Sequence, residues 1–371
     1  MSNYKLSDIC KIRYGKDHKS LDNGNIPVYG TGGIMRYVDS TLYEKESVLI
    51  PRKGTLSNLF YVDEPFWTID TLFYTEIDKS KVLPKYLYFK LKTIDLAGMN
   101  VGTAVPSLTT ALLNEIELNI PSLENQIKIV DILSSLENKI ENNNAIIANL
   151  EEQAQAIFKS WFVDFEPFQD GEFVESDLGD IPKGWSIESL GDIVNIYDSE
   201  RKPLSQMVRQ GMERNYPYYG ANGVIDYVED YLFDGKYLLL GEDGTVQTNE
   251  GYPILNYIEE KFWVSNHAHI MTGDKISTEF LYVSIKRRNI RDIITGAVQQ
   301  KINQRNLKSI KLVIPESNIL INFQNIIEPL FEKVLVLKKS NKKLEETRDT
   351  LLPKLMSGEI RVEEAIEVEE M

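Results

Sequence analysis

The sequence is poor in cysteine and in long apolar runs. Cys10 is the single cysteine in 371 residues, so an internal disulfide is excluded, and we expect a reducing, cytoplasmic location. No histidine or asparagine pattern indicates a nucleophile there, so we interpret Cys10 as a small buried residue. No run of about 18 apolar residues predicts a transmembrane helix, and no apolar leader of the secretory type is expected.

Motifs for nucleotide or metal chemistry are also absent. There is no G-x-x-x-x-G-K-[ST] loop, and "GTGG" and "GANG" lack the spacing of a dinucleotide-binding turn. "NYPYYG" lacks the second proline of the motif with which amino-methyltransferases hold a flipped base. His267 and His269 have no third ligand at a metal-like spacing, so hydrogen-bonded histidines are favoured over a zinc site. We therefore predict a chain without catalytic activity of its own.

The charge is acidic overall but unevenly distributed. A net charge of −15 disfavours a protein that coats DNA or RNA through clustered Lys and Arg. Residues 286–311 nevertheless hold eight basic residues and one acid, whereas residues 151–200 hold thirteen acids and two lysines. The basic cluster is either a binding patch or an ordinary solvated face.

One half of the chain repeats the other. "NIPVYGTGGIMRYV" at residues 25–38 returns as "NYPYYGANGVIDYV" at residues 215–228. An offset of about 190 far exceeds a solenoid repeat of roughly 20–50 residues, so a whole domain is duplicated. The glycine-containing segments are interpreted as tight turns, and residues 84–92 and 278–286 as short helices. We predict two similar α+β domains with short strands.

A long helical segment follows each copy, at residues 122–162 and 316–356. Apolar residues recur at alternating spacings of three and four through about four heptads, which indicates that the two seams bury against each other. Asn143 and Asn341 interrupt the seams, and we expect them to lie close together in an antiparallel pair. Pro329 predicts a kinked start of the second helix. The seams are Leu133, Leu136, Ile140, Asn143, Ile147, Leu150, Ala154, Ile157 and Trp161, and Ile327, Leu330, Val334, Leu337, Asn341, Leu344, Arg348, Leu351 and Leu355.

The remaining segments connect or end these parts. The acidic segment between the first helix and the second domain contains Gly and Pro and is interpreted as an extended linker. The predicted order is a first domain (1–121), a long helix (122–165), a linker (166–184), a second domain (185–315), a second long helix (316–358) and an acidic tail (359–371).

The two copies agree in their glycine, proline, aromatic and apolar positions but differ on their loops. "PRKG" at 51–54 corresponds to "GEDG" at 241–244, and such an exchange of bases for acids disfavours a duplicated catalytic site. Arg, Lys, Asn, Gln, Asp and Glu are the side chains that read base edges in the major groove. Residues 299–305, "QQKINQR", are rich in them. Two domains that share their glycine, proline, aromatic and apolar positions but differ in their loop residues indicate two modules that read different targets.

These features together resemble the specificity (S) subunits of type I restriction-modification systems. The resemblance is carried by the paired "YGTGG" and "YGANG" turns, the paired "FW" strands, and "LNEIELNIPSLENQIKIVDIL" leading into the first long helix. "AIFKSWFVDFEPF" and "LLPKLMSGEIRV" are similar to the family's central and C-terminal regions. The second copy departs from this pattern, because its glutamine is displaced to Gln324.

The resemblance implies a sequence-specific DNA-recognition subunit. Each domain would be a target recognition domain for one half of a bipartite double-stranded DNA site, and the helices would form an antiparallel coiled coil that sets the distance between the halves. The chain would bind two modification (methyltransferase) subunits, and restriction (endonuclease and translocase) subunits would join them. S-adenosylmethionine, ATP and Mg would belong to those partners.

Candidate DNA contacts combine the turns with the polar loop residues. The tyrosines and glycines recur in both copies, so an architectural role is an equal alternative for them. Phe158, Trp161 and Phe162 are candidate partner-docking residues, with packing in the coiled-coil core as the alternative. The candidate DNA contacts are Tyr29, Gly32, Arg36, Arg52, Lys53, Asn58, Ser107 and Thr109, and Tyr219, Asn222, Gln247, Asn249, Gln299, Gln300, Lys301, Asn303 and Arg305.

Two other functions compete with this one. The first is a nuclease or methyltransferase in its own right, which the missing motifs disfavour. The second is a coiled-coil adaptor with two protein-binding domains, which would bind partners without DNA.

Overall fold

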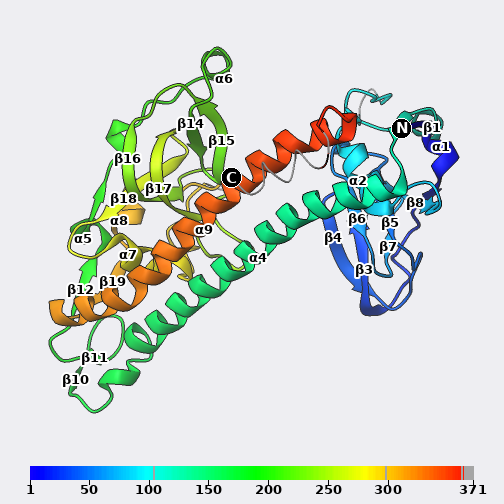
Figure 1. Ribbon diagram of the computed structural model, residues 1–371. Coiled ribbons are helices and arrows are strands. Elements are labelled where there is room, and N and C mark those ends of the chain that lie inside the picture. The colour runs from blue at the N-terminus through cyan, green and yellow to red at the C-terminus, as the bar shows by residue number, and fades with distance from the viewer. Residues whose placement is uncertain (103–104, 297–298, 361, 363–371) are drawn as a thin grey trace. The chain divides into compact units, whose positions relative to one another are not determined.

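A computed structural model describes residues 1–102, 105–296, 299–360 and 362 (Figure 1). The chain divides into two compact units: residues 1–142 with 341–371 form unit 1, and residues 143–340 form unit 2. Each unit therefore combines one copy of the repeat with part of both long helices. Most of the predicted acidic tail, 359–371, lies outside the described residues. Within the described part, no helix is long and apolar enough to cross a bilayer.

The duplication is visible in the order of the elements. Both copies contain largely the same series of short strands and helices, which confirms the predicted α+β class and the short helices at 84–92 and 278–286. The first copy consists of β1 (Ser2–Lys5), α1 (Leu6–Ile9), β2 (Cys10–Tyr14), β3 (Asn23–Gly30), β4 (Gly33–Val38), β5 (Ser47–Pro51), β6 (Phe60–Val62), β7 (Trp67–Thr68), β8 (Leu72–Ile77), α2 (Pro84–Lys92), α3 (Thr110–Asn114) and β9 (Glu117–Ile120). The second consists of β12 (Ser186–Ser189), α5 (Leu190–Ile193), β13 (Val194–Ile196), α6 (Gln206–Arg209), β14 (Tyr216–Gly220), β15 (Gly223–Val228), β16 (Phe233–Gly241), β17 (Leu255–Val264), β18 (Ala268–Gly273), α7 (Thr278–Lys286), α8 (Gln304–Lys308) and β19 (Lys311–Ile314).

The sheets of the two copies differ in one strand. In the second copy, β17 pairs with β16 and with β14, so one sheet has the order β13-β18-β16-β17-β14-β15. In the first copy, the corresponding stretch is divided into β6 and β7, and two sheets result, β2-β8-β5-β6 and β4-β3-β7. Pro65 lies between β6 and β7 and cannot donate a ladder hydrogen bond, which accounts for the break.

The repeated "YGTGG" and "YGANG" motifs form matching hairpin turns. Gly30 pairs with Gly33 in the first copy, and Gly220 pairs with Gly223 in the second. Gly33 and Gly223 have φ angles of 110° and 123°, a region that residues with a Cβ rarely adopt. The prediction of tight turns at these glycines is confirmed.

The two long helices are α4 (Leu123–Phe162) and α9 (Ser317–Ser357), and each predicted seam residue is buried or half-buried. In unit 1, Leu136 of α4 belongs to the same core as Leu355 of α9. In unit 2, Ala154 of α4 belongs to the same core as Ile327 of α9. The start of each helix thus packs against the end of the other, so the pairing is antiparallel. The helix α9 continues without a break through Pro329, and the kink at its start stays a prediction.

The two seam asparagines are buried, with exposed fractions of 8% for Asn143 and 7% for Asn341. Asn143 belongs to unit 2 and Asn341 to unit 1. Their proximity to each other therefore stays a prediction.

The acidic connector is folded rather than extended, which corrects the sequence-based expectation. It contains a 3-10 turn (Glu166–Phe168) and a short hairpin of β10 (Phe173–Val174) with β11 (Ile181–Pro182). The rings of Phe165 and Phe168 lie 5.5 and 5.0 Å from that of Trp185. Phe165 and Phe168 thus pack against the core of unit 2, whereas Phe173 and the acids of the connector stay exposed.

A glutamine joins the start of each long helix to its domain, and it is buried in unit 1 and half-buried in unit 2. In unit 1, Gln126 accepts a hydrogen bond from Leu83 N (2.8 Å) and donates to Lys81 O (3.0 Å), at the start of α2. In unit 2, Gln324 accepts from the hydroxyl of Ser277 and donates to Glu279 (3.3 Å), at the start of α7. The displaced glutamine of the second copy therefore serves the same connection about one helical turn further along.

We predict that Gln126→Ala lowers the free energy of unfolding of unit 1 by about 2–4 kcal/mol, because Leu83 N and Lys81 O lose their buried partner. Hydrogen exchange of α2 in increasing urea measures the change. Gln153→Ala, at an exposed glutamine on the same helix, is the control and should cost less than about 0.5 kcal/mol. Equal effects of the two substitutions would contradict the anchoring role of Gln126.

Candidate nucleic-acid interface

Three loops of the first domain meet at one end of its sheets, and we call them the first loop surface (residues 31–32, 52–59, 101–102 and 105–109). The N–H of Gly54 donates to Pro106 O (3.0 Å), and Leu108 N donates to Arg52 O (2.9 Å). Asn58 Nδ2 donates to Thr31 O (2.9 Å), which adds the hairpin turn to the group. These bonds order backbone that would otherwise be free to move.

The structure brings five of the predicted residues of the first domain together on this surface, and they are Gly32, Arg52, Lys53, Asn58 and Ser107. Thr109 caps α3 by accepting a hydrogen bond from Leu112 N. Tyr29 is half-buried and packs against Phe60 and Phe66. Arg36, on β4, donates to Asn23 Oδ1 and to Leu21 O, and both of these partners lie outside the three loops.

The second domain places its loops in the same way, and we call them the second loop surface (residues 221–222, 242–254, 289–296 and 299–303). Gly244 N donates to Gln300 O (3.0 Å), and Ile302 N donates to Glu242 O (2.8 Å). These two bonds match those of Gly54 and Leu108 in the first domain. The backbone frame is thus shared, although the side chains on it differ.

The predicted residues of the second domain divide between this surface and the core. Tyr219 is 6% exposed, and its hydroxyl donates to Glu260 (2.5 Å), so it lies inside the domain. The amide oxygen of Gln247 is buried without a partner in the described part of the chain. Asn303 caps α8 by accepting from Asn306 N. The exposed members are Asn222, Asn249, Gln299, Gln300, Lys301 and Arg305.

A buried ionic network, which the sequence did not reveal, supports the second loop surface. His269 is 1% exposed; its Nδ1 lies 2.6 Å from Asp198 Oδ2 and its Nε2 lies 2.8 Å from Ile302 O. Because a carboxylate and a carbonyl only accept hydrogen bonds, His269 donates from both nitrogens. It therefore connects the strand β18 to the loop that carries residues 299–303. The prediction of a hydrogen-bonded histidine at this position is confirmed.

Glu242 extends the network towards the surface. It binds Arg201 Nη1 at 2.6 Å and Lys301 Nζ at 3.2 Å. Arg52 stands at the corresponding position of the first domain, where it donates to Asp70 O (3.1 Å) and lies over the ring of Tyr14. A charge reversal at one position of the frame is thus matched by a different set of partners in each copy.

The network holds its two acids ionised. Burial by itself raises the pKa of Asp198, but the hydrogen bond and charge of His269, with help from Ile270 N–H and Arg201, outweigh burial and lower that pKa. Burial likewise opposes ionisation of Glu242, and Arg201, His269 and Lys301 together lower its pKa.

The oxygen and nitrogen atoms of Asp198, Glu242 and His269 lie within 4.8 Å of one another, a grouping that can in principle hold a metal ion. However, Arg201 already contacts both carboxylates, and His269 uses both ring nitrogens for hydrogen bonds. The donor set therefore fits an ion-pair network better than a metal site.

The basic cluster of residues 286–311 is largely paired within the chain. Partners are Glu151 for Lys286, Glu152 for Arg287, Asp292 for Arg288, Glu242 for Lys301 and Asp177 for Lys311. Arg291 donates to Asn249 O at 2.9 Å. Arg305 and Lys308 are exposed, with no ion pair to the described residues. These two cations on α8 are thus the members of the cluster best placed for a phosphate.

The predicted docking residues form an aromatic cluster in unit 2. Phe162 is 4% exposed, and its ring lies 4.8 Å from that of Phe323. The Trp161 ring lies 5.8 Å from Phe323, and the Phe158 ring 5.6 Å from Phe280. This packing agrees with the alternative of a core role, and a role of these residues in docking stays a prediction.

Comparison with known proteins places this architecture in a family. The family model described as "Type I restriction modification DNA specificity domain" matches residues 1–152 and 182–346. The chain belongs to this family. It is a specificity subunit with two recognition domains in tandem, which confirms the resemblance stated from the sequence.

Several relatives match over most of the chain. The type I restriction enzyme MjaIX specificity subunit of Methanocaldococcus jannaschii is 29% identical, covering 87% of this chain and 79% of its own length. The HindI specificity subunit of Haemophilus influenzae is 27% identical, with 75% and 78% covered. A crystal structure of a type I S subunit from M. genitalium is similar over 95% of both chains, with a TM-score of 0.59 and 18% identity. The last comparison confirms the fold.

We predict that acid destabilises unit 2 of this specificity subunit through Asp198. A carboxyl whose folded pKa is depressed contributes stability above its unfolded pKa of about 4, and this contribution is lost as the pH falls through the folded pKa. Asp198→Asn should therefore weaken the decline in urea resistance between about pH 5 and pH 3. At pH 7 it should cost about 2–4 kcal/mol, because His269 and Arg201 lose a buried partner.

Urea unfolding at a series of pH values measures this effect. Asp180→Asn, at an exposed carboxylate of the same unit, is the control. A pH profile of Asp198→Asn that matches wild type would show that the network does not carry the acid sensitivity.

Proposed function

We propose that each loop surface reads one half of a bipartite double-stranded DNA target. The observation that carries this proposal is the matched pair of backbone frames with unlike side chains. Gly54 and Gly244 bind equivalent carbonyls, whereas Arg52 and Lys53 on one frame correspond to Glu242 and Asp243 on the other. Base-edge recognition depends on side-chain identity at fixed backbone positions, so two such frames read two different sequences.

The long helices would keep the two halves of the target at a set distance. In support, α4 and α9 are continuous over 40 and 41 residues, and each is packed into both units by its apolar seam. A packed helix pair is stiff compared with a flexible linker, and it suits a DNA site with a fixed gap.

The chain itself would be non-catalytic and would scaffold the enzymes of the complex in the cytoplasm. Its partners would be two modification (methyltransferase) subunits and restriction (endonuclease and translocase) subunits. S-adenosylmethionine, ATP and Mg would be bound by those partners. The names of the relatives, which are specificity subunits of type I restriction enzymes, support this assignment.

A coiled-coil adaptor with two protein-binding domains is the second candidate. The paired helices alone would serve it equally well. The exposed amides Gln299 and Gln300 of the second loop surface, and the exposed Arg305 on α8, favour DNA instead, because base and phosphate contacts use these groups.

Co-expression with a modification subunit from the same host should produce DNA methylation at a split motif. We expect two defined halves around an unspecified gap of constant length, and modification-sensitive sequencing of the host genome maps them. Exchange of residues 185–315 for the second domain of another specificity subunit should change one half and leave the other. Absence of methylation, despite a stable complex, would favour the adaptor.

Arg305→Ala should weaken DNA binding by the assembled complex and reduce the slope of log affinity against log salt by about 1, as expected for one lost phosphate contact. Fluorescence anisotropy with a DNA duplex of the mapped motif at several salt concentrations measures both. Lys333→Ala, at an exposed lysine of α9, is the matched control. If both variants bind like wild type, Arg305 lies outside the DNA contact.

A further inference from the structure

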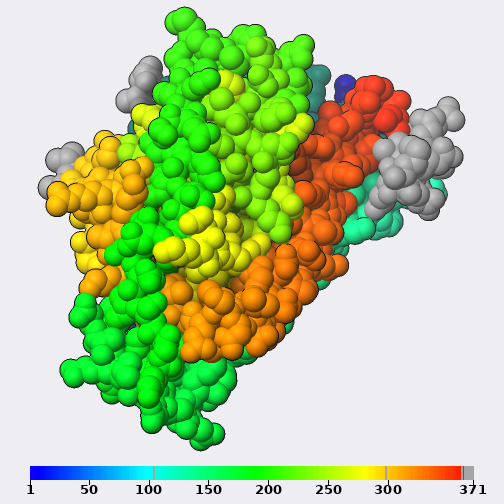
Figure 2. Space-filling view, turned by 90° about the vertical axis from the view of Figure 1, so that its left-hand side faces the viewer, coloured from blue at the N-terminus to red at the C-terminus, as the bar shows by residue number. Residues whose placement is uncertain are grey.

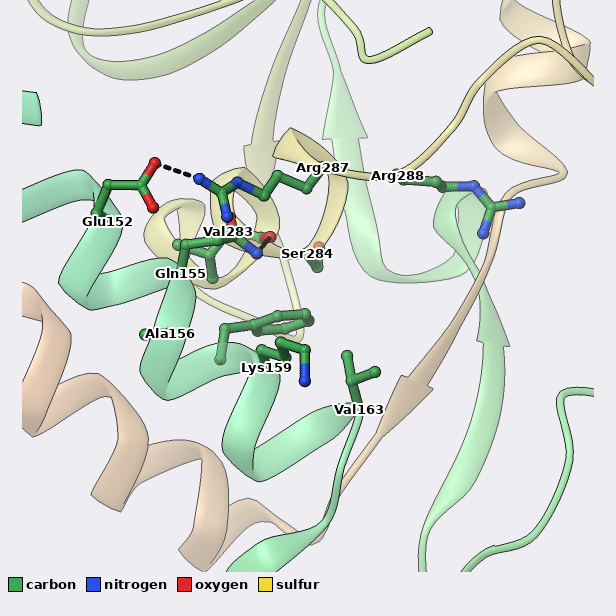
Figure 3. Close-up of a pocket in the computed structure, with 10 residues that line it drawn as sticks. Glu152, Gln155, Ala156, Lys159, Val163, Val283, Ser284, Arg287 and Arg288 are labelled. Atoms are coloured by element: carbon green, nitrogen blue, oxygen red, sulfur yellow. Dashed lines mark hydrogen bonds and ion pairs between the residues drawn. The ribbon is translucent and has the colours of Figure 1, made fainter. Parts of the chain in front are cut away.

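Unit 2 contains a pocket of about 490 Å³ between the end of α4 and the helix α7 (Figure 3). From α4, Gln155 and Lys159 face it, and Val283 and Ser284 of α7 form the opposite wall. Ala156, Phe158 and Val163 make most of the remaining lining apolar. The loop surfaces do not include these residues, so DNA recognition as described above leaves the pocket unused.

The pocket has an unused hydrogen-bond acceptor in its wall. Gln155 is 9% exposed, and its Nε2 donates to Val283 O at 3.2 Å. Its Oε1 is buried and has no partner in the described part of the chain. A buried acceptor without a donor is unfavourable, so a ligand that supplies an N–H group to it binds more tightly than apolar contact alone would allow.

The first domain shows what fills the corresponding place in unit 1. The short helices at 84–92 and 278–286, and the long helices that follow each copy, correspond at an offset of 194. This offset pairs Lys90 of α2 with Ser284 of α7, and Met356 of α9 with Phe162 of α4. Lys90 is half-buried, and its Nζ donates to Met356 O at 2.7 Å. Its aliphatic stem and terminal N–H thus bridge the short helix and the end of the long helix.

Ser284 is too short to do this in unit 2. Its hydroxyl donates to Leu281 O within α7 (2.9 Å). In unit 1 this place is therefore occupied by Lys90, whereas in unit 2 the pocket beside Ser284 is left open. Figure 2 shows the neighbouring face of unit 2, where the first part of α9 (orange) packs against the second recognition domain (green to yellow).

The charges around the pocket limit the kind of ligand. Lys159, Arg287 and Arg288 line it together with a single carboxylate, that of Glu152, which pairs with Arg287 (Figure 3). A positively charged ligand is therefore disfavoured. A phosphate is also a poor match for the interior, because Gln155 Oε1 is an acceptor and phosphate oxygens act mainly as acceptors at neutral pH.

We propose that this pocket binds a segment of a partner polypeptide that inserts an apolar side chain, donates a main-chain N–H to Gln155 and presents an acidic residue to Arg287 and Arg288. The inference rests on the proposed function, because the partner is taken to be the modification subunit of the same complex. Since Lys90 closes the corresponding place in unit 1, the chain uses this contact for one of its two modification subunits.

Ser284→Lys tests the proposal by supplying the side chain that closes the first copy. Native mass spectrometry and titration of the purified chain with purified modification subunit give stoichiometry and affinity. We expect Ser284→Lys to bind one modification subunit at least tenfold more weakly than wild type, so that complexes with one such subunit accumulate. Ser284→Ala, which leaves the pocket open, should assemble like wild type.

A second variant tests the pocket independently, in case Ser284→Lys does not fold. Ala156 is exposed on the pocket wall, so Ala156→Trp obstructs the mouth without entering the core, and it should weaken the same subunit. Circular dichroism and thermal unfolding establish that both variants are folded. Folded variants with wild-type affinity and stoichiometry would overturn the proposal.

Methylation of a split motif by the wild-type complex distinguishes a wrong pocket assignment from a wrong proposed function. If the wild-type complex methylates a split motif and Ser284→Lys assembles normally, only the pocket assignment is wrong. If the wild-type chain binds the modification subunit but no motif is methylated, the two-reader function is wrong, and the effect of Ser284→Lys on assembly still tests the pocket.

Discussion

The apolar seams of α4 and α9 are the constraint on which both units depend. In unit 1, Leu136 and Leu355 share a core with Tyr86 of the short helix α2, and in unit 2, Ile327 shares a core with Phe280 of α7. Each such side chain contributes about 1.5–3 kcal/mol by its burial, so neither recognition domain has a complete core without the helices. The loop surfaces are therefore held, within each unit, by the same packing that pairs the helices. Figure 1 shows this for unit 2, where α4 and α9 pass beside α7.

A frame made of backbone hydrogen bonds allows the loops to differ. Gly54 and Gly244 donate to equivalent carbonyls, and these bonds do not depend on the neighbouring side chains. Arg52 in the first copy and Glu242 in the second stand at the same position, and the opposite charges there need only different neighbouring side chains and carbonyls as partners. Glu242 obtains them from Arg201, Lys301 and the charge of His269, whereas Arg52 uses a carbonyl and an aromatic ring. The buried network is thus the means by which the second domain carries an acid at this position.

Local patterns in the sequence were sufficient for the features that depend on neighbouring residues. The heptad spacing predicted the seams, the paired glycines predicted the hairpin turns, and the repeat predicted two domains of one fold. The ionic network was missed because Asp198 and His269 are 71 positions apart, and no spacing connects them. The fold of the acidic connector was missed for a similar reason, since the partner of Phe165 and Phe168 is Trp185 in the next domain. Of the candidate DNA contacts, Tyr219 could not be separated from the exposed residues, because recurrence in both copies does not distinguish a core tyrosine from a reader.

The duplication has not produced two equivalent halves. The copies differ at their loops and at Pro65, which divides a strand that is continuous in the second domain. They also differ at Lys90, which occupies its place in unit 1, and at Ser284, which leaves the pocket of unit 2 open. The first difference lies on the loop surfaces, for which we propose DNA reading, and the last lies at the junction of domain and long helix. Lys90 and Ser284 belong to neither loop surface, so a difference in DNA targets does not by itself account for the difference between the junctions. Under the proposal made above, the asymmetric junction corresponds to unequal contacts of the chain with its two modification subunits.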